Sequence, residues 1–271
     1  MSVDLKQKAA LLFYTKDDVD KILATHGKKL KDVEVDLKTI KEWFKTQPHI
    51  PELPSDRLIV SYLIMNKFHI EKTKSRLEMN YSIRNVMPEL FCHNPLDLKI
   101  RDSHRYFKVI GMSKLTKDLR RLFIVKPKDD ACYDITIIIS RLIMSLELLT
   151  TYDINNGDEY IIDYANVNLS MITKTKPTDV MKILGLAEIF VHKNVELLKE
   201  YYSLDMLPKD YGGTAKSIDE LSDDFQEFLE SHDEYLSKWI QIRVDAKMRP
   251  EPLVNDEILG YYGNFKSLDV D

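Results

Sequence analysis

Cysteine and glycine are both scarce in this chain of 271 residues, which holds two cysteines and eight glycines. Cys92 and Cys132 supply neither a disulfide framework nor a four-ligand zinc site, so we expect free thiols. No G-x-G-x-x-G or P-loop pattern occurs, and such glycine loops are what cradle phosphates in nucleotide-binding proteins. These absences argue against a metal-stapled fold and against nucleotide-dependent catalysis.

Basic charge is not in excess, because the formal net charge is −5. Nonspecific nucleic-acid binding needs clustered Lys and Arg, so we expect no nucleic-acid partner. The polar N-terminus lacks the apolar core of a secretory signal, and the most apolar run, Ile135 to Leu149, is interrupted by Arg141 and Glu147. That run is shorter than the ~20 residues that span a bilayer. We therefore expect a cytoplasmic protein in which residues 135–149 form a buried helix.

Residues in catalytic patterns are also missing. The seven histidines show no metal-ligand spacing, and we interpret them as surface or capping residues. Ser140 and Ser145 lie in the apolar helix without a G-x-S-x-G elbow. Asp163, at the end of an apolar run, is isolated, and such a carboxylate more often caps or pairs locally. We expect no catalytic residue, no metal ion and no cofactor.

Hydrophobic periodicity divides the chain into three parts. Residues 1–95 read as an all-helical module, because several segments repeat apolar residues at helical spacing. These segments are a helix opening at Thr15 and the ranges 37–44, 56–66 and 70–87. Residues 96–240 read as an α/β domain, and residues 241–271 read as a C-terminal extension that packs on it.

The α/β domain is predicted from two short apolar runs, 122–125 and 160–164, on either side of the helix at 135–149. This strand–helix–strand order predicts a βαβ unit in a parallel or mixed sheet. Residues 179–184 and 195–202 are short helical candidates. Ser217 to Trp239 is predicted to be one amphipathic helix.

A closing turn is predicted at Leu207-Pro208-Lys209-Asp210-Tyr211-Gly212-Gly213. Proline cannot extend a helix, and paired glycines permit conformations closed to other residues. Together with other separated segments this motif resembles the CRAL-TRIO lipid-binding family, in its branch similar to tocopherol-transfer and retinaldehyde-binding proteins. The resemblance spans nearly the whole chain and rests on residues 53–57, 66–74, 84–91, 156–163, 191–198, 207–213, 249–250 and 263–271.

The resemblance implies an α/β sandwich that encloses one hydrophobic molecule and carries it between membranes, with a mobile amphipathic helix as a gate. The expected ligand is a tocopherol, retinoid, carotenoid or phosphoinositide, and the expected partner is a transient, phosphoinositide-containing membrane surface met by a monomer. The chain departs from the family before Phe190, where about one βαβ unit of roughly 30 residues is lacking. A shortened form, a mis-assembled gene model and a divergent member that re-pairs its sheet, with residues 188–192 as a substitute strand, all remain open.

The candidate ligand-binding residues come from the two apolar runs and the helix between them. Those expected to line the pocket are Phe123, Val125, Leu142, Ile143, Leu146 and Ile161, whereas Ser140 and Met144 are expected to meet a head group. A plain hydrophobic core is the alternative for the helix. For the whole chain the alternatives are a protein-interaction or regulatory module with a lost or open cavity and, in third place, an enzyme.

Overall fold

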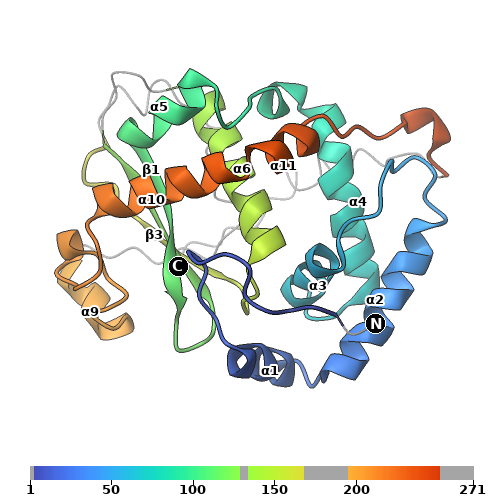
Figure 1. The fold of residues 1–271 in the computed structure, drawn as a ribbon, viewed down its shortest axis with the longest axis horizontal. Coiled ribbons are helices and arrows are strands. Elements are labelled where there is room, and N and C mark those ends of the chain that lie inside the picture. The colour runs from blue at the N-terminus through green and yellow to red at the C-terminus, as the bar shows by residue number, and fades with distance from the viewer. Residues whose placement is uncertain (1–2, 129–133, 168–194, 251–271) are drawn as a thin grey trace, which may run out of the picture.

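The computed structural model describes residues 3–128, 134–167 and 195–250. Within them the chain is an α/β protein, in which a group of N-terminal helices packs beside a small sheet covered by further helices (Figure 1). The sequence-based expectation of an α/β protein that opens with a helical module is therefore confirmed at this coarse level. Of the two cysteines, Cys92 is an exposed free thiol, whereas Cys132 lies outside the described residues.

Two of the N-terminal helices, α1 (Lys16–Thr25) and α3 (Asp56–Met65), begin at a residue whose side chain caps them. In α1 the Thr15 side chain accepts from the Asp18 amide while Asp18 reaches back to Thr15, which forms a capping box. Ser55 caps α3 by accepting from the Leu58 amide at 3.2 Å. The further helices of this part are α2 (Leu30–Phe44), α4 (Ile70–Val86) and η1 (Pro88–Phe91).

One apolar cluster holds these helices together. It joins side chains of α1 to α4, and it includes Leu37, Phe44 and Ile50. Val244 from the C-terminal part of the chain is buried in the same cluster. His49 differs from the expectation for histidines, because its side chain is buried and bonds through Nε2 to Glu78 at 2.9 Å. Tertiary packing rather than local pattern decides that burial.

The sheet contains β1 (Phe107–Leu115), β2 (Arg121–Pro127) and β3 (Asp158–Ile162), in the order β1-β2-β3. Because β1 runs antiparallel and β3 parallel to β2, the sheet is mixed. Helix α6 (Ile135–Tyr152) connects β2 to β3, so the predicted strand–helix–strand unit is confirmed.

Two elements before β2 were missed in the sequence. They are α5 (Leu98–Tyr106) and β1, which is interrupted by Lys108, Gly111 and Lys114 and so shows no clean alternation of apolar and polar residues. A Cβ atom on Gly111 would lie 3.1 Å from the Phe123 ring, so a larger residue there would require the ring to shift by a few tenths of an ångström. The pairing of β1 with β2, which is not visible in a local pattern, decides its conformation.

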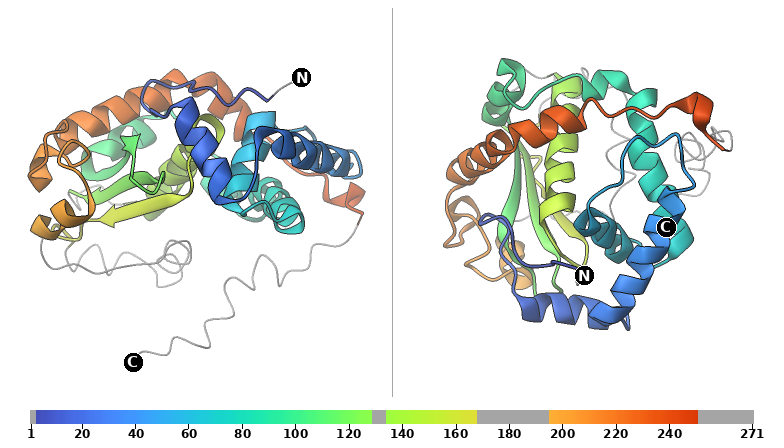
Figure 2. Two further views of the ribbon diagram at one scale, coloured as in Figure 1. Left: turned by 90° about the horizontal axis from the view of Figure 1, so that it is seen from below. Right: turned by 45° about the vertical axis from the view of Figure 1, so that its right-hand side comes forward.

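The C-terminal part of the chain forms further helices. They are η2 (Val195–Leu197), α9 (Leu198–Tyr201), η3 (Lys209–Tyr211), α10 (Ile218–Ser231), α11 (Asp233–Trp239) and η4 (Ala246–Met248). Helix α10 packs against β1, and Figure 2 shows it running along the sheet. The prediction of one helix over 217–239 is wrong, because α10 ends at His232 (φ −110°, ψ 21°) before α11 begins.

Helix α6 is a core helix with polar groups in its interior. By length and composition alone it could cross a membrane, but 56% of it is buried in the protein, and core helices meet the same criteria. Arg141 and Glu147 lie on its buried side. The expected helix at 179–184 and the substitute strand at 188–192 lie outside the described residues, as does the end of the C-terminal extension from residue 251.

Candidate functional site

Five aliphatic side chains of α6 form a continuous stripe along the helix, and all five are only half-buried. They are Ile135, Ile139, Leu142, Ile143 and Leu146. Spacings of three, four, seven and eight residues put them on one face, whereas the opposite face is buried in the core. We call this set the α6 stripe. It contains three of the residues that the sequence nominated for a ligand pocket.

One face of the sheet adjoins this stripe. The strand register pairs Phe123 with Tyr160 and Val125 with Ile162, so all four side chains share a face. The rings of Phe123 and Tyr160 stack with centroids 5.2 Å apart, and both residues belong to the cluster against which Ile143 packs. Val125 and Ile162 are only half-buried. Through Ile143, the α6 stripe therefore borders the apolar cluster that contains Phe123 of this sheet face.

Ser140 supplies a polar group at the edge of the stripe. Its side chain is fully buried, and its hydroxyl has no hydrogen-bond partner among the described residues. Ser140 lies one helical turn from both Ile143 and Met144, and Met144 is itself buried in the core. Ser145, in contrast, donates to the Arg141 carbonyl at 2.8 Å. The Ser140 hydroxyl is thus a free donor next to an apolar surface.

Ile161 lies apart from the other nominated residues. It is on the opposite face of the sheet, in the cluster with Leu122 and Ile124. Successive strand residues point to opposite faces, so a ligand held against α6 would meet Tyr160 and Ile162 instead. The sequence shows that successive residues of this strand point to opposite faces of the sheet. It does not show which of them face α6, because the register with β2 decides that.

Asp163, just after β3, pairs locally. The Lys126 ammonium lies 2.8 Å away, and the Tyr211 hydroxyl donates to its carboxylate at 2.8 Å. Burial opposes the charge, but the bonds from Lys126, the Ala165 amide and Tyr211 outweigh it and lower the pKa of Asp163. This carboxylate is held as a charged structural partner.

The Leu207 to Gly213 motif forms the closing turn that its sequence predicts. The Gly213 amide donates to the Pro208 carbonyl at 3.0 Å, and Gly212 has a φ of 73°. A Cβ atom on Gly213 would lie 1.9 Å from the Leu207 carbonyl oxygen, so this position admits only glycine. Through Tyr211 the turn is joined to Asp163, and it therefore fixes the end of β3 against the segment that leads into α10.

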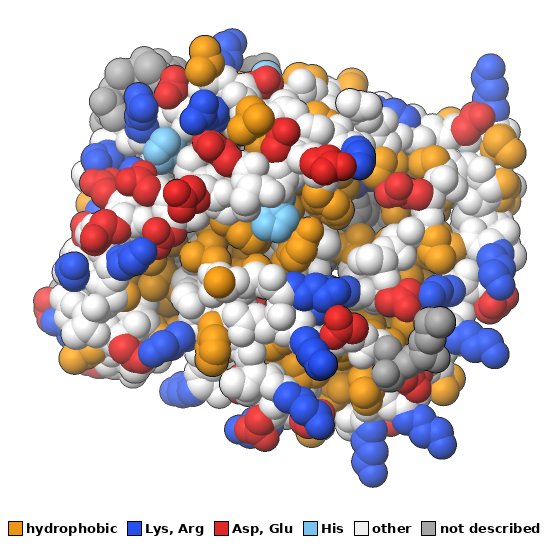
Figure 3. Space-filling model, viewed as in Figure 1, with side chains coloured by type: hydrophobic (Ala, Val, Ile, Leu, Met, Phe, Trp, Pro, Cys, Tyr) orange, Lys and Arg blue, Asp and Glu red, His pale blue; other side chains and the backbone are white. Residues whose placement is uncertain are grey.

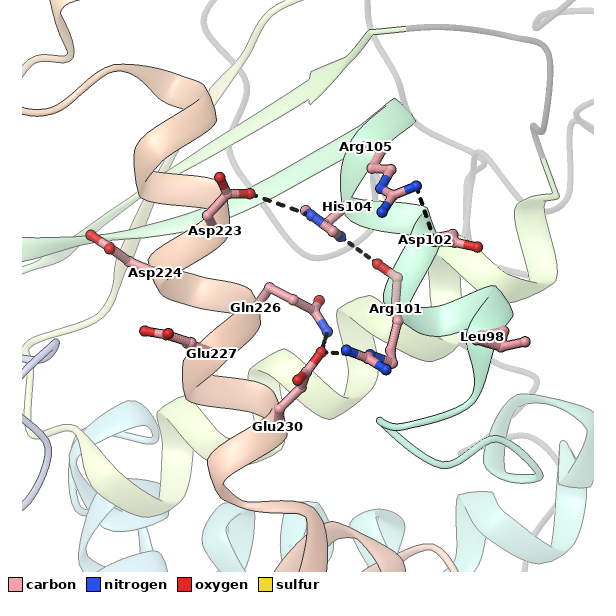
Figure 4. Close-up of a pocket in the computed structure, with 10 residues that line it drawn as sticks. All are labelled: Leu98, Arg101, Asp102, His104, Arg105, Asp223, Asp224, Gln226, Glu227 and Glu230. Atoms are coloured by element: carbon pink, nitrogen blue, oxygen red, sulfur yellow. Dashed lines mark hydrogen bonds and ion pairs between the residues drawn. The ribbon is translucent and has the colours of Figure 1, made fainter.

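A hollow of about 470 Å³ lies between α5 and α10 and is lined mainly by charged and polar side chains (Figure 4). Arg101 reaches Glu230 with 2.8 Å between Nε and Oε1, and His104 faces Asp223 with 3.4 Å between Nε2 and Oδ1. Burial lowers the pKa of His104, which leaves its ring neutral at pH 7. Figure 3 shows the acidic side chains of α10 gathered along this side of the molecule.

The chemistry of this charged hollow is limited by its own pairing. Gln226 donates to Glu230 at 2.8 Å and accepts from the buried Arg141. The Arg101–Glu230 pair already joins the two walls, α5 and α10. No cluster of His, Cys, Asp or Glu suited to a metal ion occurs among the described residues. The hollow is thus a poor match for an apolar ligand, which the stripe on α6 suits better.

Comparison with protein families gives a match within the helical part of the chain. Residues 29–100 are similar to the family described as "Pinta-like, UBA domain". The matched segment runs from the start of α2 into α5 and includes α3 and α4. It covers a minority of the 271 residues. No curated protein matches the sequence.

This finding corrects the resemblance drawn from the sequence. The CRAL-TRIO assignment is wrong, because the family match points to a different domain and no CRAL-TRIO match accompanies it. The segments that suggested it have local structural roles. Ser55 in the first segment caps α3, and Gly157 in the Asn-Gly segment turns the chain with a φ of 116°. Caps and turns of this kind recur in many folds, so short motifs built from them do not distinguish one protein family from another.

Proposed function

We propose that the α/β part of the chain binds a small hydrophobic lipid against the α6 stripe and the adjoining face of the sheet. The ligand classes that we propose are tocopherols, retinoids, carotenoids and phosphoinositides. The observation that carries the proposal is the stripe itself, five neighbouring aliphatic side chains that the described part of the protein leaves half-buried. Apolar surface of this kind favours contact with another apolar body over contact with water.

The magnitude of the effect fits a reversible carrier. A ligand that covers on the order of 300 Å² of apolar surface gains about 7 kcal/mol at roughly 25 cal/mol per Å². Loss of translational and rotational freedom reduces that gain. A polar head would reach the Ser140 hydroxyl only after a movement of α6 or its neighbours, because that side chain is fully buried. Such a protein would act as a monomeric cytoplasmic carrier that meets membranes transiently, and the proposal includes no chemical step.

The direct test is extraction of the purified protein followed by mass spectrometry of the extract. A co-purifying apolar molecule, stoichiometric with the protein, would support the proposal. Titration with fluorescent tocopherol, retinal and phosphatidylinositol analogues then separates the ligand classes. If no lipid co-purifies and none of the analogues binds, the lipid-binding proposal fails. Turnover of an ester substrate would point instead to an enzyme.

The match to a UBA domain favours one second candidate, a protein-interaction or regulatory module in the helical part of the chain. It would be supported if wild-type protein without bound lipid still formed a stable complex with a protein partner, and if that complex were lost on changes in α2 to α4. The two candidates use different parts of the molecule. Variants of the α6 stripe should affect lipid binding alone.

A further inference from the structure

Residues 5–14 lead into α1 without forming a helix or a strand, and their side chains are buried in two different cores. Leu5 and Tyr14, near the two ends, belong to the cluster that holds the N-terminal helices together. Ala9 and Leu12, between them, belong to the cluster that joins the sheet, α6 and α10. We call residues 5–14 the N-terminal strap. Figure 1 shows it in dark blue, running from beside α2 to the sheet and then on to α1.

Hydrogen bonds to other segments hold the strap near its two ends. The buried Arg57 of α3 donates to the Lys6 carbonyl at 2.9 Å and also to the Tyr14 hydroxyl. The Phe13 amide donates to the Ser113 carbonyl of β1 at 2.9 Å. Because Arg57 is bonded to both ends, the strap forms a loop whose ends are fixed to the same side chain.

The middle of the strap, residues 7–12, is held by side-chain burial. The Leu12 amide and the Gln7 side chain both donate to the Ala9 carbonyl at 3.0 Å, so these hydrogen bonds are internal to the strap. Lys8 pairs with the exposed Asp4 at 3.5 Å. Within the part of the chain that the structure describes, no hydrogen bond joins residues 7–12 to another helix or strand. Segments held in this way open locally at a lower cost in free energy than global unfolding.

Leu12 is the main apolar contact of this middle section. It is fully buried, whereas the ring of its neighbour Phe13 is 49% exposed. The cluster that Leu12 joins also contains Phe225 and Phe228 of α10. Release of residues 7–12 would therefore uncover apolar side chains of the α/β part, and water solvates such a surface poorly. We call the surface under Ala9 and Leu12 the strap seat.

We propose that the N-terminal strap is an autoinhibitory cover, which opens without unfolding of the protein and leaves a seat for an extended apolar peptide. The peptide would have the chemistry of the strap itself, with two apolar side chains in the places of Ala9 and Leu12. The closed strap excludes such a peptide, because it occupies the same surface. The proposal does not require lipid binding, and the strap contributes no residue to the α6 stripe.

Labelling of a buried thiol in the full chain measures the opening. Leu12→Cys and, as a matched control, Leu122→Cys in β2 both place a thiol at a fully buried leucine position, with Cys92 and Cys132 replaced by serine. We expect a thiol reagent to label the first variant at least tenfold faster in the absence of urea. Its labelling rate should also rise less steeply with urea, because local opening exposes less surface than global unfolding. Equal rates or equal urea dependence would overturn the proposal.

Binding of a fluorescent peptide with the sequence of residues 3–14 tests the seat. The full-chain variant Leu12→Asp, with its cover weakened, should bind this peptide at least tenfold more tightly than the wild type. Phe13→Asp makes the same change at the exposed neighbour and should behave like the wild type. A peptide that carries Leu12→Asp itself should not bind. Equal affinities for the two variants, or no binding to either, would contradict the proposal, and the labelling experiment decides the opening even if Leu12→Asp fails to fold.

Discussion

Arg121, at the start of β2, and Asp153, just after α6, form a bidentate ion pair in which both side chains are buried. The Nε–Oδ2 and Nη2–Oδ1 distances are both 2.8 Å. Arg121 also donates to the Met112 carbonyl at 2.9 Å, and the Ser61 hydroxyl donates to the Asp153 carbonyl at 3.4 Å. The pair therefore joins the sheet and α6, and the backbone of Asp153 contacts α3 in the helical part.

Removing one partner of this pair should be strongly destabilising. In Asp153→Asn the Arg121 guanidinium keeps its charge in a buried site, and breaking such pairs costs about 3–5 kcal/mol. The measurement is the free energy of unfolding in urea. The matched control is Glu42→Gln, which breaks the exposed pair with Lys45 and should change stability little, because water and salt screen such a pair. Similar costs for the two variants would show that the buried pair has no special structural role.

Glu147 predicts a pH dependence of stability. Burial raises the pKa of its carboxyl above the ordinary 4.5, despite the hydrogen bond of 2.6 Å that it accepts from Tyr235. Below pH 4.5 the folded and unfolded chains both hold this proton. As the pH rises further the unfolded chain releases it first, so the contribution of Glu147 to stability falls until the pH passes its pKa in the folded protein and stays at that lower level above it.

Glu147→Gln should therefore gain stability relative to the wild type as the pH is raised from 4 to 7. Urea unfolding at several pH values measures the difference. The control is Glu234→Gln, since the hydrogen bond and charge of Lys238 lower the pKa of Glu234, and its removal should have the opposite sign and a small size. A constant difference between Glu147→Gln and the wild type across this range would refute the assignment.

The closing turn predicts different costs for two adjacent glycines. Gly213→Ala places a Cβ atom against the Leu207 carbonyl, so the backbone must shift, and we expect a loss of about 3 kcal/mol. Gly212→Ala meets only the flexible Lys199 side chain and the strain of a positive φ, about 1 kcal/mol. Thermal unfolding of both variants gives the comparison. An equal or reversed order would show that the turn adapts.

The proposed lipid site predicts that charge on the α6 stripe abolishes binding. Leu142→Asp and Leu146→Asp place a carboxylate on the apolar surface, and affinity for a fluorescent lipid analogue should fall at least tenfold, or ~1.4 kcal/mol. Val35→Asp makes the same change on an exposed part of α2 and should leave affinity unaltered. Circular dichroism checks that all three variants are folded. Unchanged affinity in both stripe variants would exclude α6 as the site.

Local patterns in the sequence predicted those helices and turns whose conformation is determined by residues close together in the chain. Helix α1 begins at its Thr15–Asp18 capping box, and the apolar run at 135–149 forms α6. The turn at Gly212-Gly213 needs glycine, because Gly212 has a positive φ and a Cβ atom on Gly213 would meet the Leu207 carbonyl oxygen. In each case the cause lies in neighbouring residues, through hydrogen bonds to free amides, helical periodicity or backbone sterics.

Pairing and burial between distant segments were decided only by the tertiary structure. Strand β1 depends on its partner β2, and the burial of His49 depends on Glu78 in another helix. The register of β3 puts Ile162 rather than Ile161 on the face toward α6, although the two are adjacent and chemically identical. Family membership inferred from short motifs failed for the same reason. Caps and turns report local backbone geometry, whereas the position of a binding surface depends on which distant side chains are packed together.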